Sequence, residues 1–356
     1  MLYFLHLSRK FWKSSYHELR GICSFKPVES LWDNLIIEAK SGLLSSLNSK
    51  DNIFIYGAFP LSDNRSIDKD DYTESIYSSI KKQAEMADGK SIMIDIYDVN
   101  SKHGYSGKDL EVLFGNRLEK EGFKVSMEKP EVLIYAVLFN WSCYSGMTRY
   151  AAGKRELLNP IRHYNHSRSG ISRAEMKIEE AFDRFGIKAR KGIAIDLGAA
   201  PGGWSCFLAK RGFSVIAIDN AELDKKKIGA AGVPVEVYSD MAKPRKGTIL
   251  HYKMGFQEAY SKLKDTKADL IADDMNISPA ESAAAVTKYL NLLKENGICI
   301  MTMKSVTKNV LKHISAIKKE LEGKLEIEKM AVLPSNRQEL TILFRKRAGS
   351  KNLLIA

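Results

Sequence analysis

Charged residues that could hold a ligand follow several short apolar segments in the C-terminal half of the chain. They are Asp196, Asp219, Asp240, Asp274 and Lys304. If the apolar segments are strands of an open α/β sheet, these residues lie beyond its carboxyl ends, where such sheets bind their ligands. Carboxylates at this edge can accept hydrogen bonds from ribose hydroxyls or attract a cation, so the pattern predicts a nucleotide-like ligand.

A glycine-rich turn, GAAPGG at residues 198–203, follows the first of these acids, Asp196. Its glycines allow the backbone to approach a ligand closely. The spacing is not G-x-G-x-x-G and no Gly-Lys-Ser/Thr follows, so a dinucleotide is disfavoured and a P-loop is excluded. Asp196 would repel a pyrophosphate but suits a cation, and S-adenosylmethionine carries a sulfonium and an ammonium group. The alternative is a tight strand-to-helix turn that binds no ligand.

The cofactor predicted from this turn is S-adenosylmethionine, with Asp219 at its ribose and Asp240 at its adenine. Acids at the ends of successive strands favour this interpretation over a turn without a ligand. The residues assigned to the cofactor are Asp196, Gly198, Ala199, Ala200, Pro201, Gly202, Gly203, Trp204, Asp219, Asp240 and Asp274.

Two lysines occupy positions that are costly for a charge. Lys304 directly follows the apolar segment at 298–303, and Lys177 lies between Ala174 and Ala181 on the apolar side of a predicted helix. A buried lysine is unfavourable unless it is paired or loses its proton. Each lysine could instead extend its charged end to solvent from the edge of the core. Position alone leaves both interpretations open.

A sheet with helices on its faces must position these residues. The alternation of apolar strands with amphipathic helices predicts a Rossmann-type α/β domain with a seven-stranded, mostly parallel sheet. The predicted strands are 193–195, 213–218, 233–238, 269–272, 298–303, 325–332 and 340–344. Serine-to-glutamate capping boxes at 172–175 and 278–281 predict the starts of two of the helices.

The C-terminal half resembles the FtsJ/RrmJ-type Rossmann-fold ribose 2′-O-methyltransferases. The matching stretches, between about residues 167 and 347, are SRAEMKIEEAF, DLGAAPGGWS, IADDM, MTMKS and SNRQELTILF. The resemblance implies a catalytic tetrad of Lys177, Asp274, Lys304 and Glu339. The segment IADDMNIS departs from the family, which commonly has Pro-Asn after Asp-Met-Ala, so the choice of Asp274 over Asp273 stays open.

The tetrad implied by the resemblance suits the methylation of a ribose hydroxyl. Lys304 would take the 2′-OH proton if burial and nearby Lys177 lower its pKa. Lys177, protonated, would stabilise the developing alkoxide. Asp274 and Glu339 would hold the lysines and the hydroxyl in line with the methyl group, and no metal is needed.

Net charge predicts a polyanionic partner. The chain of 356 residues has a formal charge of +12 and a pI near 9.3, and basic residues alternate with aromatic ones in the segment 147–165. Structured RNA is the expected partner, although a merely basic soluble protein is the alternative. The residues assigned to RNA binding are Arg149, Tyr150, Lys154, Arg155, Arg162 and Tyr164.

The N-terminal half resembles the RNA-binding region of RNA-modifying enzymes. IMIDIYDV, a loop, a helix and FKVSMEKPEVLIYAVLFN follow the order of a THUMP domain, and LYFLHLS with a helix carrying Glu18-Leu19 resembles the ferredoxin-like domain that usually precedes it. The expected domains are 1–60 (ferredoxin-like), 61–165 (THUMP) and 166–356 (Rossmann-fold methyltransferase). A generic α+β domain is the alternative for the first half. The pattern of apolar residues predicts an edge strand over residues 2–7 and a helix over residues 31–47.

The prediction is an S-adenosylmethionine-dependent RNA ribose 2′-O-methyltransferase. Most THUMP-bearing families act on tRNA, which is favoured here, whereas the bacterial THUMP-containing 23S rRNA cytidine 2′-O-methyltransferases have the most similar organisation. Base methylation would want an Asn/Asp-Pro-Pro-aromatic motif, which IADDMNIS lacks. A non-catalytic RNA-binding or chaperone protein is the alternative of another class.

Composition bears on the cellular compartment of the protein and on whether it binds a metal. No apolar run approaches the ~18 residues that cross a membrane. The four cysteines, Cys23, Cys143, Cys206 and Cys299, form no CxxC pair, and no histidines stand at metal-ligand spacing with them. A reduced, cytoplasmic protein without metal is expected. Its oligomeric state stays open, with a monomer favoured.

Overall fold

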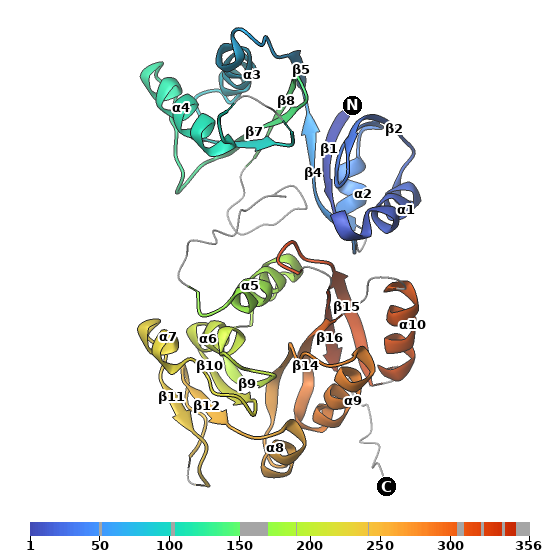
Figure 1. Ribbon diagram of the computed structural model, residues 1–356, viewed down its shortest axis with the longest axis vertical. Helices are drawn as coiled ribbons and strands as arrows, with labels where there is room; N and C mark the ends of the chain where they lie inside the picture. Colours follow the sequence, from blue (N-terminus) through green and yellow to red (C-terminus); the bar gives the residue numbers. More distant parts are fainter. Residues whose placement is uncertain are drawn as a thin grey trace. The chain divides into compact units, whose positions relative to one another are not determined.

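The chain forms two compact units, Met1–Arg162 and His163–Ala356 (Figure 1). The computed structural model describes residues 1–49, 52–100, 104–149, 170–189, 191–240, 242–304, 310–321, 324–336 and 339–346.

The first unit begins with a four-stranded antiparallel sheet. The elements follow the order β1 (Leu2–Leu7), a 3-10 turn (Arg9–Phe11), α1 (Trp12–Ile22), β2 (Phe25–Leu31), β3 (Asn34–Ala39), α2 (Leu43–Ser49) and β4 (Ile55–Leu61). The strands lie in the order β2-β3-β1-β4, so β1 is an inner strand and not the edge strand expected from its weak alternation. Helices α1 and α2 cover one face of this sheet through Leu19, Leu43 and Leu47.

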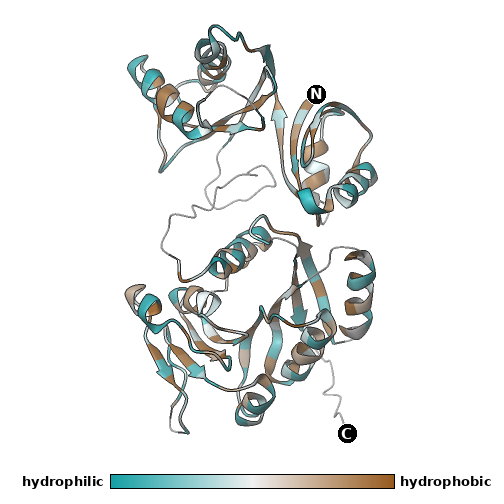
Figure 2. Cartoon of the chain, viewed as in Figure 1, coloured by the Kyte–Doolittle hydropathy of each residue, from teal (hydrophilic) through white to brown (hydrophobic). Residues whose placement is uncertain are grey.

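A second four-stranded sheet follows in the same unit. Its elements are β5 (Asp63–Ser66), α3 (Tyr72–Met86), β6 (Ile92–Asp98), α4 (Gly107–Lys120), β7 (Val132–Phe139) and β8 (Ser142–Arg149), with strand order β5-β8-β7-β6. Helices α3 and α4 cover one face, and α4 carries both hydrophilic and hydrophobic bands, as an amphipathic helix should (Figure 2).

The free faces of the two sheets pack against each other. All eight residues of β7 are buried, because alternate side chains contact the helices on one face and the first sheet on the other. Phe59 of β4 stacks on Tyr135 of β7 with ring centroids 4.1 Å apart, and the Tyr135 hydroxyl donates a hydrogen bond to the Pro60 carbonyl. The unit is therefore a stack of helices, sheet, sheet and helices.

This sandwich explains why the prediction of a helix over 31–47 was wrong in its first part, where β3 lies, and correct only from Leu43, where α2 begins. In β3, Leu35 and Ile37 face the helices while Ile36 faces the second sheet, so three consecutive apolar residues are buried on two faces. A strand buried on both faces loses the alternation by which strands are identified, and a short apolar run then resembles part of a helix.

The second unit is a three-layer α/β domain around a mixed sheet. In chain order its elements are α5 (Arg173–Phe185), β9 (Gly192–Leu197), α6 (Gly203–Lys210), β10 (Phe213–Ile218), α7 (Lys225–Ala230), β11 (Val235–Val237), β12 (Ile249–Tyr252), α8 (Phe256–Lys262), β13 (Ala268–Asp273), α9 (Pro279–Tyr289), a 3-10 turn (Leu290–Leu292), β14 (Leu293–Met303), α10 (Val310–Leu321), β15 (Leu325–Ala331) and β16 (Leu340–Lys346). The strand order is β11-β12-β10-β9-β13-β14-β16-β15, and only the pairings of β16 are antiparallel. The predicted mostly parallel α/β sheet is confirmed.

The sheet has eight strands, so the predicted number of seven was wrong. The missed strand, β12, has the sequence ILHY, and all four residues are buried. A buried parallel strand this short gives no periodicity, and its His251 is an unusual core residue. The His251 Nε2 lies 3.3 Å from the carbonyl oxygen of Asp219, which satisfies one of its ring nitrogens.

The topology places a binding edge between β9 and β13. These two parallel strands are neighbours, and the chain leaves β9 toward β10 on one side and reaches β13 on the other. Such a switch point opens a crevice beyond the carboxyl ends of the strands. Helices α5 and α6 pack on one face of the sheet beside this edge, through Ile178, Phe182 and Phe207.

Helix caps gave one correct prediction and one wrong one. At the start of α9, Ser278 and Glu281 form a reciprocal capping box. At the start of α5, the Ser172 side chain makes no capping hydrogen bond, and Glu175 instead accepts from the backbone of Ile171. The second box is therefore confirmed, and the first was wrong in its geometry.

Candidate active site

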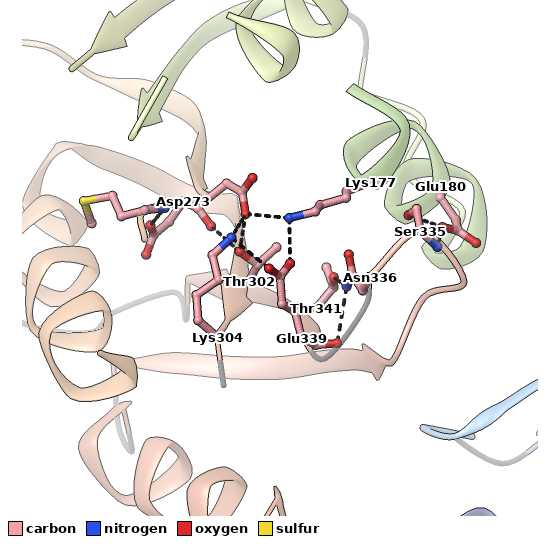
Figure 3. A network of polar contacts seen from close by, with 11 residues as sticks. Lys177, Glu180, Asp273, Thr302, Lys304, Ser335, Asn336, Glu339 and Thr341 are labelled. Carbon is pink, nitrogen blue, oxygen red and sulfur yellow. Dashed lines mark hydrogen bonds and ion pairs between the residues drawn. The ribbon is translucent and has the colours of Figure 1, made fainter. Parts of the chain in front are cut away.

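Four charged side chains meet at the carboxyl edge of the eight-stranded sheet (Figure 3). Lys177 Nζ lies 2.7 Å from Glu339 Oε2 and 3.5 Å from Asp274 Oδ1. Lys304 Nζ lies 3.2 Å from Glu339 Oε1 and also donates to Asp274 Oδ1. Each lysine therefore bridges both carboxylates, and the group, which we call the Lys-Asp-Lys-Glu ring, has no formal net charge.

Four separate segments position the ring. Asp274 follows β13, and its backbone N–H donates to the Leu197 carbonyl at the end of β9. Lys304 follows β14, and Glu339 precedes the antiparallel β16. Because Met303 pairs with Leu340 in that ladder, Lys304 and Glu339 lie side by side one position further along. Lys177 reaches them from helix α5.

The ring is partly buried. The exposed fractions of its side chains are between 11% and 18%. Ion pairs at this depth are screened less by water than surface pairs. The remaining exposure means that the four side chains are not closed off from solvent.

Buried polar residues hold the ring in place. The Thr302 hydroxyl donates to Asp274 Oδ1 at 2.6 Å, and Thr302 is 1% exposed. The Asn336 amide donates to the Glu339 carbonyl at 3.4 Å and to the Thr341 hydroxyl at 2.6 Å. These residues were not predicted, because their role depends on contacts between strands that a single sequence does not reveal.

Helix α5 is also tied directly to the loop that carries Glu339. Glu180, one turn after Lys177, accepts hydrogen bonds from the backbone N–H (2.9 Å) and the hydroxyl of Ser335. Glu180 is only 5% exposed. This contact fixes the distance between the helix that supplies one lysine and the loop that supplies one carboxylate.

The pKa of Lys304 is raised, so the lowered pKa that was set as the condition for Lys304 to take the proton is not found. Burial acts to lower the pKa, but the charges and hydrogen bonds of Asp274 and Glu339 together outweigh it. The prediction considered burial and the second lysine, and it omitted two carboxylates that both lysines share. In this arrangement Lys304 holds its proton firmly.

Asp273 and Asp274 have different surroundings although they are adjacent. Asp274 contacts both lysines, whereas Asp273 is fully buried and accepts from Met275 N and Ser282. Burial is the main cause that raises the pKa of Asp273 to about 7, and the charge of Asp274 adds to it. Geometry thus assigns the shared carboxylate of the ring to Asp274.

Asp196, the second-last residue of β9, is a fully buried carboxyl group. It is 0% exposed, Ser205 donates to its Oδ2 at 2.6 Å, and its Oδ1 has no hydrogen-bond partner among the described residues. Burial raises its pKa to about 8, and nearby Asp274, Asp219 and Asp273 raise it further against the effect of Ser205. A buried carboxylate in this state is a favourable neighbour for a cationic group.

The glycine turn connects β9 to α6, and the protein itself fills part of the space beside it. A Cβ at Gly202 would collide with Ile228, and Gly202 has a φ of 111°. A Cβ at Gly203 would collide with the Ser172 hydroxyl. These glycines are required by packing and backbone conformation, so they do not by themselves demonstrate that a ligand approaches the turn.

Of the other residues assigned to the cofactor, Asp219 contacts this turn and Trp204 directly follows it. Asp219 accepts hydrogen bonds from the backbone of Ala200 at 3.0 Å and of Ala221 at 2.9 Å. Trp204 is 2% exposed, and its indole N–H has no partner among the described residues. Asp240 is exposed and accepts from the Tyr238 hydroxyl at 2.8 Å. The turn itself comprises Gly198, Ala199, Ala200, Pro201, Gly202 and Gly203.

Of the residues assigned to RNA binding, only Arg149 lies in the described part of the chain. It is the last residue of β8 and is exposed. Tyr150, Lys154, Arg155, Arg162 and Tyr164 lie outside the described residues. No group of histidine, cysteine and carboxylate side chains suited to a metal occurs within the described ranges, nor does any helix there have the length and apolarity to cross a membrane.

Residues 171–332, which lie within the second unit, match the family model described as FtsJ-like methyltransferase. An uncharacterized protein of Methanocaldococcus jannaschii is 28% identical over 49% of this chain and 47% of its own length. Ribosomal RNA large subunit methyltransferase M of Marinomonas sp. is 30% identical over 53% of this chain and 55% of its own. The chain thus spans about half the length of these curated relatives.

Among solved structures, TrmN from Thermus thermophilus aligns with 98% of this chain and 100% of its own, at 11% identity and a TM-score of 0.39. That TM-score is too low to establish a shared fold.

Proposed function

We propose that this protein is an S-adenosylmethionine-dependent RNA methyltransferase that acts on a ribose 2′-hydroxyl. The observation that carries the proposal is the Lys-Asp-Lys-Glu ring, in which two lysines share two carboxylates at the carboxyl edge of the sheet, beside the switch point. The match of residues 171–332 to the FtsJ-like methyltransferases supports it. A purely structural ion-pair cluster would not need to lie at the ligand-binding edge.

The carboxyl edge has the chemistry to accept the cofactor. Asp196 has a buried oxygen that no described residue hydrogen-bonds, and Asp273 lies nearby with a raised pKa. We assign the cofactor to the glycine turn with Asp196, Asp219 and Asp240. When bound, S-adenosylmethionine supplies an activated methyl group on a positively charged sulfur.

The ring residues have distinct roles in the proposed reaction. The neutral form of Lys304 takes the proton from the 2′-hydroxyl, since only an unprotonated amine can accept it. Lys177 keeps its proton and stabilises the negative charge that develops on the oxygen. Asp274 and Glu339 hold both amino groups in place, and Thr302 holds Asp274.

The raised pKa of Lys304 has a direct consequence for this mechanism. The free protein holds the proton that Lys304 must lose before it can act, because two carboxylates favour the charged amine. The reactive fraction therefore grows as pH increases, and the rate should increase with it.

For the first unit we propose RNA binding. A ferredoxin-like domain at 1–60 is supported by the order β1-α1-β2-β3-α2-β4 and by the strand order β2-β3-β1-β4. We propose residues 61–165 as a THUMP domain and 166–356 as the methyltransferase domain. The basic, aromatic residues Arg149, Tyr150, Lys154, Arg155, Arg162 and Tyr164 belong to the same proposal.

Two RNA substrates follow from two different observations. The resemblance of the N-terminal half to THUMP domains favours tRNA. The relatives named ribosomal RNA large subunit methyltransferase M favour ribosomal RNA of the large subunit. Both substrates require the same chemistry at the ring.

The test is to incubate the purified full chain with labelled S-adenosylmethionine and with tRNA or ribosomal RNA that lacks the modification. Nucleoside mass spectrometry should detect a 2′-O-methylated ribose in one of the two. Methyl groups found only on bases would contradict the assignment of the hydroxyl. Tight binding of S-adenosylhomocysteine without methyl transfer to either RNA would instead favour a non-catalytic RNA-binding protein.

A further inference from the structure

The tryptophans are distributed unequally between the two units. The chain has four, and the one in the second unit, Trp204, is 2% exposed. The three in the first unit, Trp12, Trp32 and Trp141, are 45%, 66% and 39% exposed. Tryptophan is highly buried on average, because exposing its large ring to water is unfavourable. Three exposed rings in one unit therefore indicate that this unit has a binding function.

A cation lies over each of these exposed rings. The Arg9 guanidinium is 5.5 Å from the ring centroid of Trp32, and the Lys13 amino group is 5.6 Å from that of Trp12. Lys69 lies 4.8 Å from the ring of Trp141. Because Arg9 belongs to the 3-10 turn just before α1, the Trp32 ring lies against the segment that carries Trp12 and Lys13.

The backbone at Trp32 is in a conformation that tryptophan rarely adopts. Trp32 and Asp33 form the two-residue turn between β2 and β3, and Trp32 has a φ of 56°. Such hairpin turns favour Gly, Asn or Asp at positions with positive φ, and a bulky residue there is strained. Since the ring is 66% exposed, burial in the core does not compensate for this strain. Strained residues of this kind occur preferentially at binding sites.

The charge around the two rings is positive. Arg9, Lys10 and Lys13 are exposed, and the segment from Ser8 to His17 contains no acidic residue. None of the three makes an ion pair with a carboxylate in the part of the chain that the structure describes. The acidic residue nearest to Trp32 in sequence is Asp33, whose Oδ2 lies 3.6 Å from the Nε2 of His6.

We propose that Arg9, Lys10, Trp12, Lys13 and Trp32 form a surface, here called the Trp12–Trp32 surface, that binds unpaired RNA bases by stacking. Exposed aromatic rings between cations bind single-stranded RNA, because bases stack on the rings while phosphates pair with the basic side chains. This surface deepens the proposed function, on which its choice of RNA rests. It lies outside the segment 149–164 to which RNA binding was assigned from the sequence.

The positive charge decides between RNA and a protein partner. A surface for a second copy of this chain would bring net positive surfaces together, since the whole chain has a charge of +12. Like charges at an interface are unfavourable, whereas phosphates release counterions when they bind the same residues.

The deciding variant is Trp32→Asn in the full chain. Asparagine tolerates positive φ, so the variant should be as stable as the wild type or more stable. Its affinity for a labelled single-stranded RNA of about 16 nucleotides should fall by about 5- to 100-fold, since base stacking on an aromatic ring is lost. Trp32→Phe should recover most of the affinity. Affinity for a duplex of the same length should change by less than about threefold, because paired bases offer no free face.

The matched control is Met127→Asn, which removes a side chain that is 70% exposed elsewhere in the first unit and should leave both RNA affinities unchanged. Unchanged single-stranded affinity in a folded Trp32→Asn would overturn the proposal. Loss of stability in Trp32→Asn, with no Trp32→Phe recovery of RNA affinity, would show a structural role instead. A dimer that dissociates in Trp32→Asn would assign the surface to a second copy.

Failure of the proposed function has a different result. If the wild type transfers no methyl group to RNA but Trp32→Asn still weakens single-stranded RNA binding, the surface stands and the ribose methyltransferase assignment falls. If the wild type methylates RNA and Trp32→Asn binds and methylates it normally, the methyltransferase assignment stands and the proposed Trp12–Trp32 surface falls.

Discussion

Strand β14 has a lysine at each end, and the two lysines differ in their surroundings. Lys294, the second residue of the strand, has a side chain that is 46% exposed and is paired with both oxygens of Asp269 at 2.9 Å. Lys304, just after the strand, is 13% exposed and lies between Asp274 and Glu339. The same strand therefore presents an ordinary surface ion pair at one edge of the sheet and a shared, partly buried network at the other.

The opposite, amino edge of the sheet has a pocket and charged residues, but those that the structure describes form no shared network of this kind. A pocket of about 490 Å³ there is lined by Lys294, Asp269, Glu328 and Arg345, among others. Two one-to-one ion pairs lie there, between Lys294 and Asp269 and between Arg345 and Glu328. Exposed pairs of this kind contribute little to stability and do little to alter reactivity. The comparison shows that the shared arrangement, and not the presence of charge or of a hollow, distinguishes the candidate active site.

The largest expected difference between the two ends of β14 is in catalysis. Lys304→Met should lower the single-turnover rate of RNA methylation by about 10²–10⁴-fold, since the general base is lost. Lys304→Arg should not rescue it, because the guanidinium does not deprotonate at usable pH. Lys294→Met, at the other end of the strand, should stay within about twofold of the wild-type rate. Near wild-type speed in a folded Lys304→Met would contradict the mechanism.

The pH dependence should follow Lys304 as well. Its pKa is raised by the two carboxylates, so below that pKa the neutral fraction grows about tenfold per pH unit. The single-turnover rate should therefore increase with pH over the whole range from about pH 6.5 to 9 without levelling off, given the ordinary lysine value of about 10.4. Lys294→Met should have the same profile. A plateau below about pH 8 would show that a group other than Lys304 takes the proton.

Through its ion pairs with the same two carboxylates, Lys304 should contribute to the free energy of unfolding at neutral pH. A raised pKa in the folded state means that the ion pairs contribute stability at neutral pH and that this contribution is lost as pH increases through the folded pKa. Lys304→Met leaves Asp274 and Glu339 less well paired, so it should lower the free energy of unfolding at pH 7, by about 1–3 kcal/mol. Lys294→Met should change it by less than about 1 kcal/mol. Equal effects in urea unfolding would remove the contrast between the ends of β14.

Asp196 should also make the free energy of unfolding fall as pH increases, but in a lower pH range than Lys304. Because burial raises its pKa to about 8, the folded protein binds this proton more strongly than the unfolded chain. The free energy of unfolding should therefore fall as pH increases from about 4 to 8 and level off above that. Asp196→Asn should show a smaller fall than the wild type, measured by urea unfolding at about pH 5 and pH 8.5. An equal fall in both proteins would mean that Asp196 is not the buried proton-binding group.

The smallest expected effect concerns a residue that touches the ring without belonging to it. Thr302→Val removes the hydroxyl that donates to Asp274 and keeps the shape of the side chain. The methylation rate should fall by about 2- to 10-fold, because Asp274 loses this hydrogen bond but keeps its ion pairs with both lysines. The control is Thr248→Val, which removes a hydroxyl bonded to the Arg245 carbonyl at the amino end of β12 and should leave the rate unchanged. If both variants have the same rate, Thr302 does not position Asp274.

Local sequence predicted much of the second unit and less of the first. Strands β9, β10, β13 and β14 each end at a turn or a charged residue, and the helices between them have clear apolar faces. In the first unit, β3 and β7 are buried on both faces, so their patterns lack alternation. That β1 lies inside its sheet follows from the pairing with β3 and β4, which no pattern within residues 2–7 contains.

The sequence by itself determined which residue types stand at the carboxyl ends of the strands, and the family resemblance selected the four of the ring. Their catalytic roles remain predictions. Only the tertiary structure decided what surrounds each of them: Lys177 meets Glu339 across 162 positions of the chain, and Lys304 lies between two carboxylates. That proximity reverses the expected direction of the Lys304 pKa shift, because charges a few ångströms apart outweigh burial. Distances between residues far apart in sequence arise from strand order and register, which no local pattern encodes.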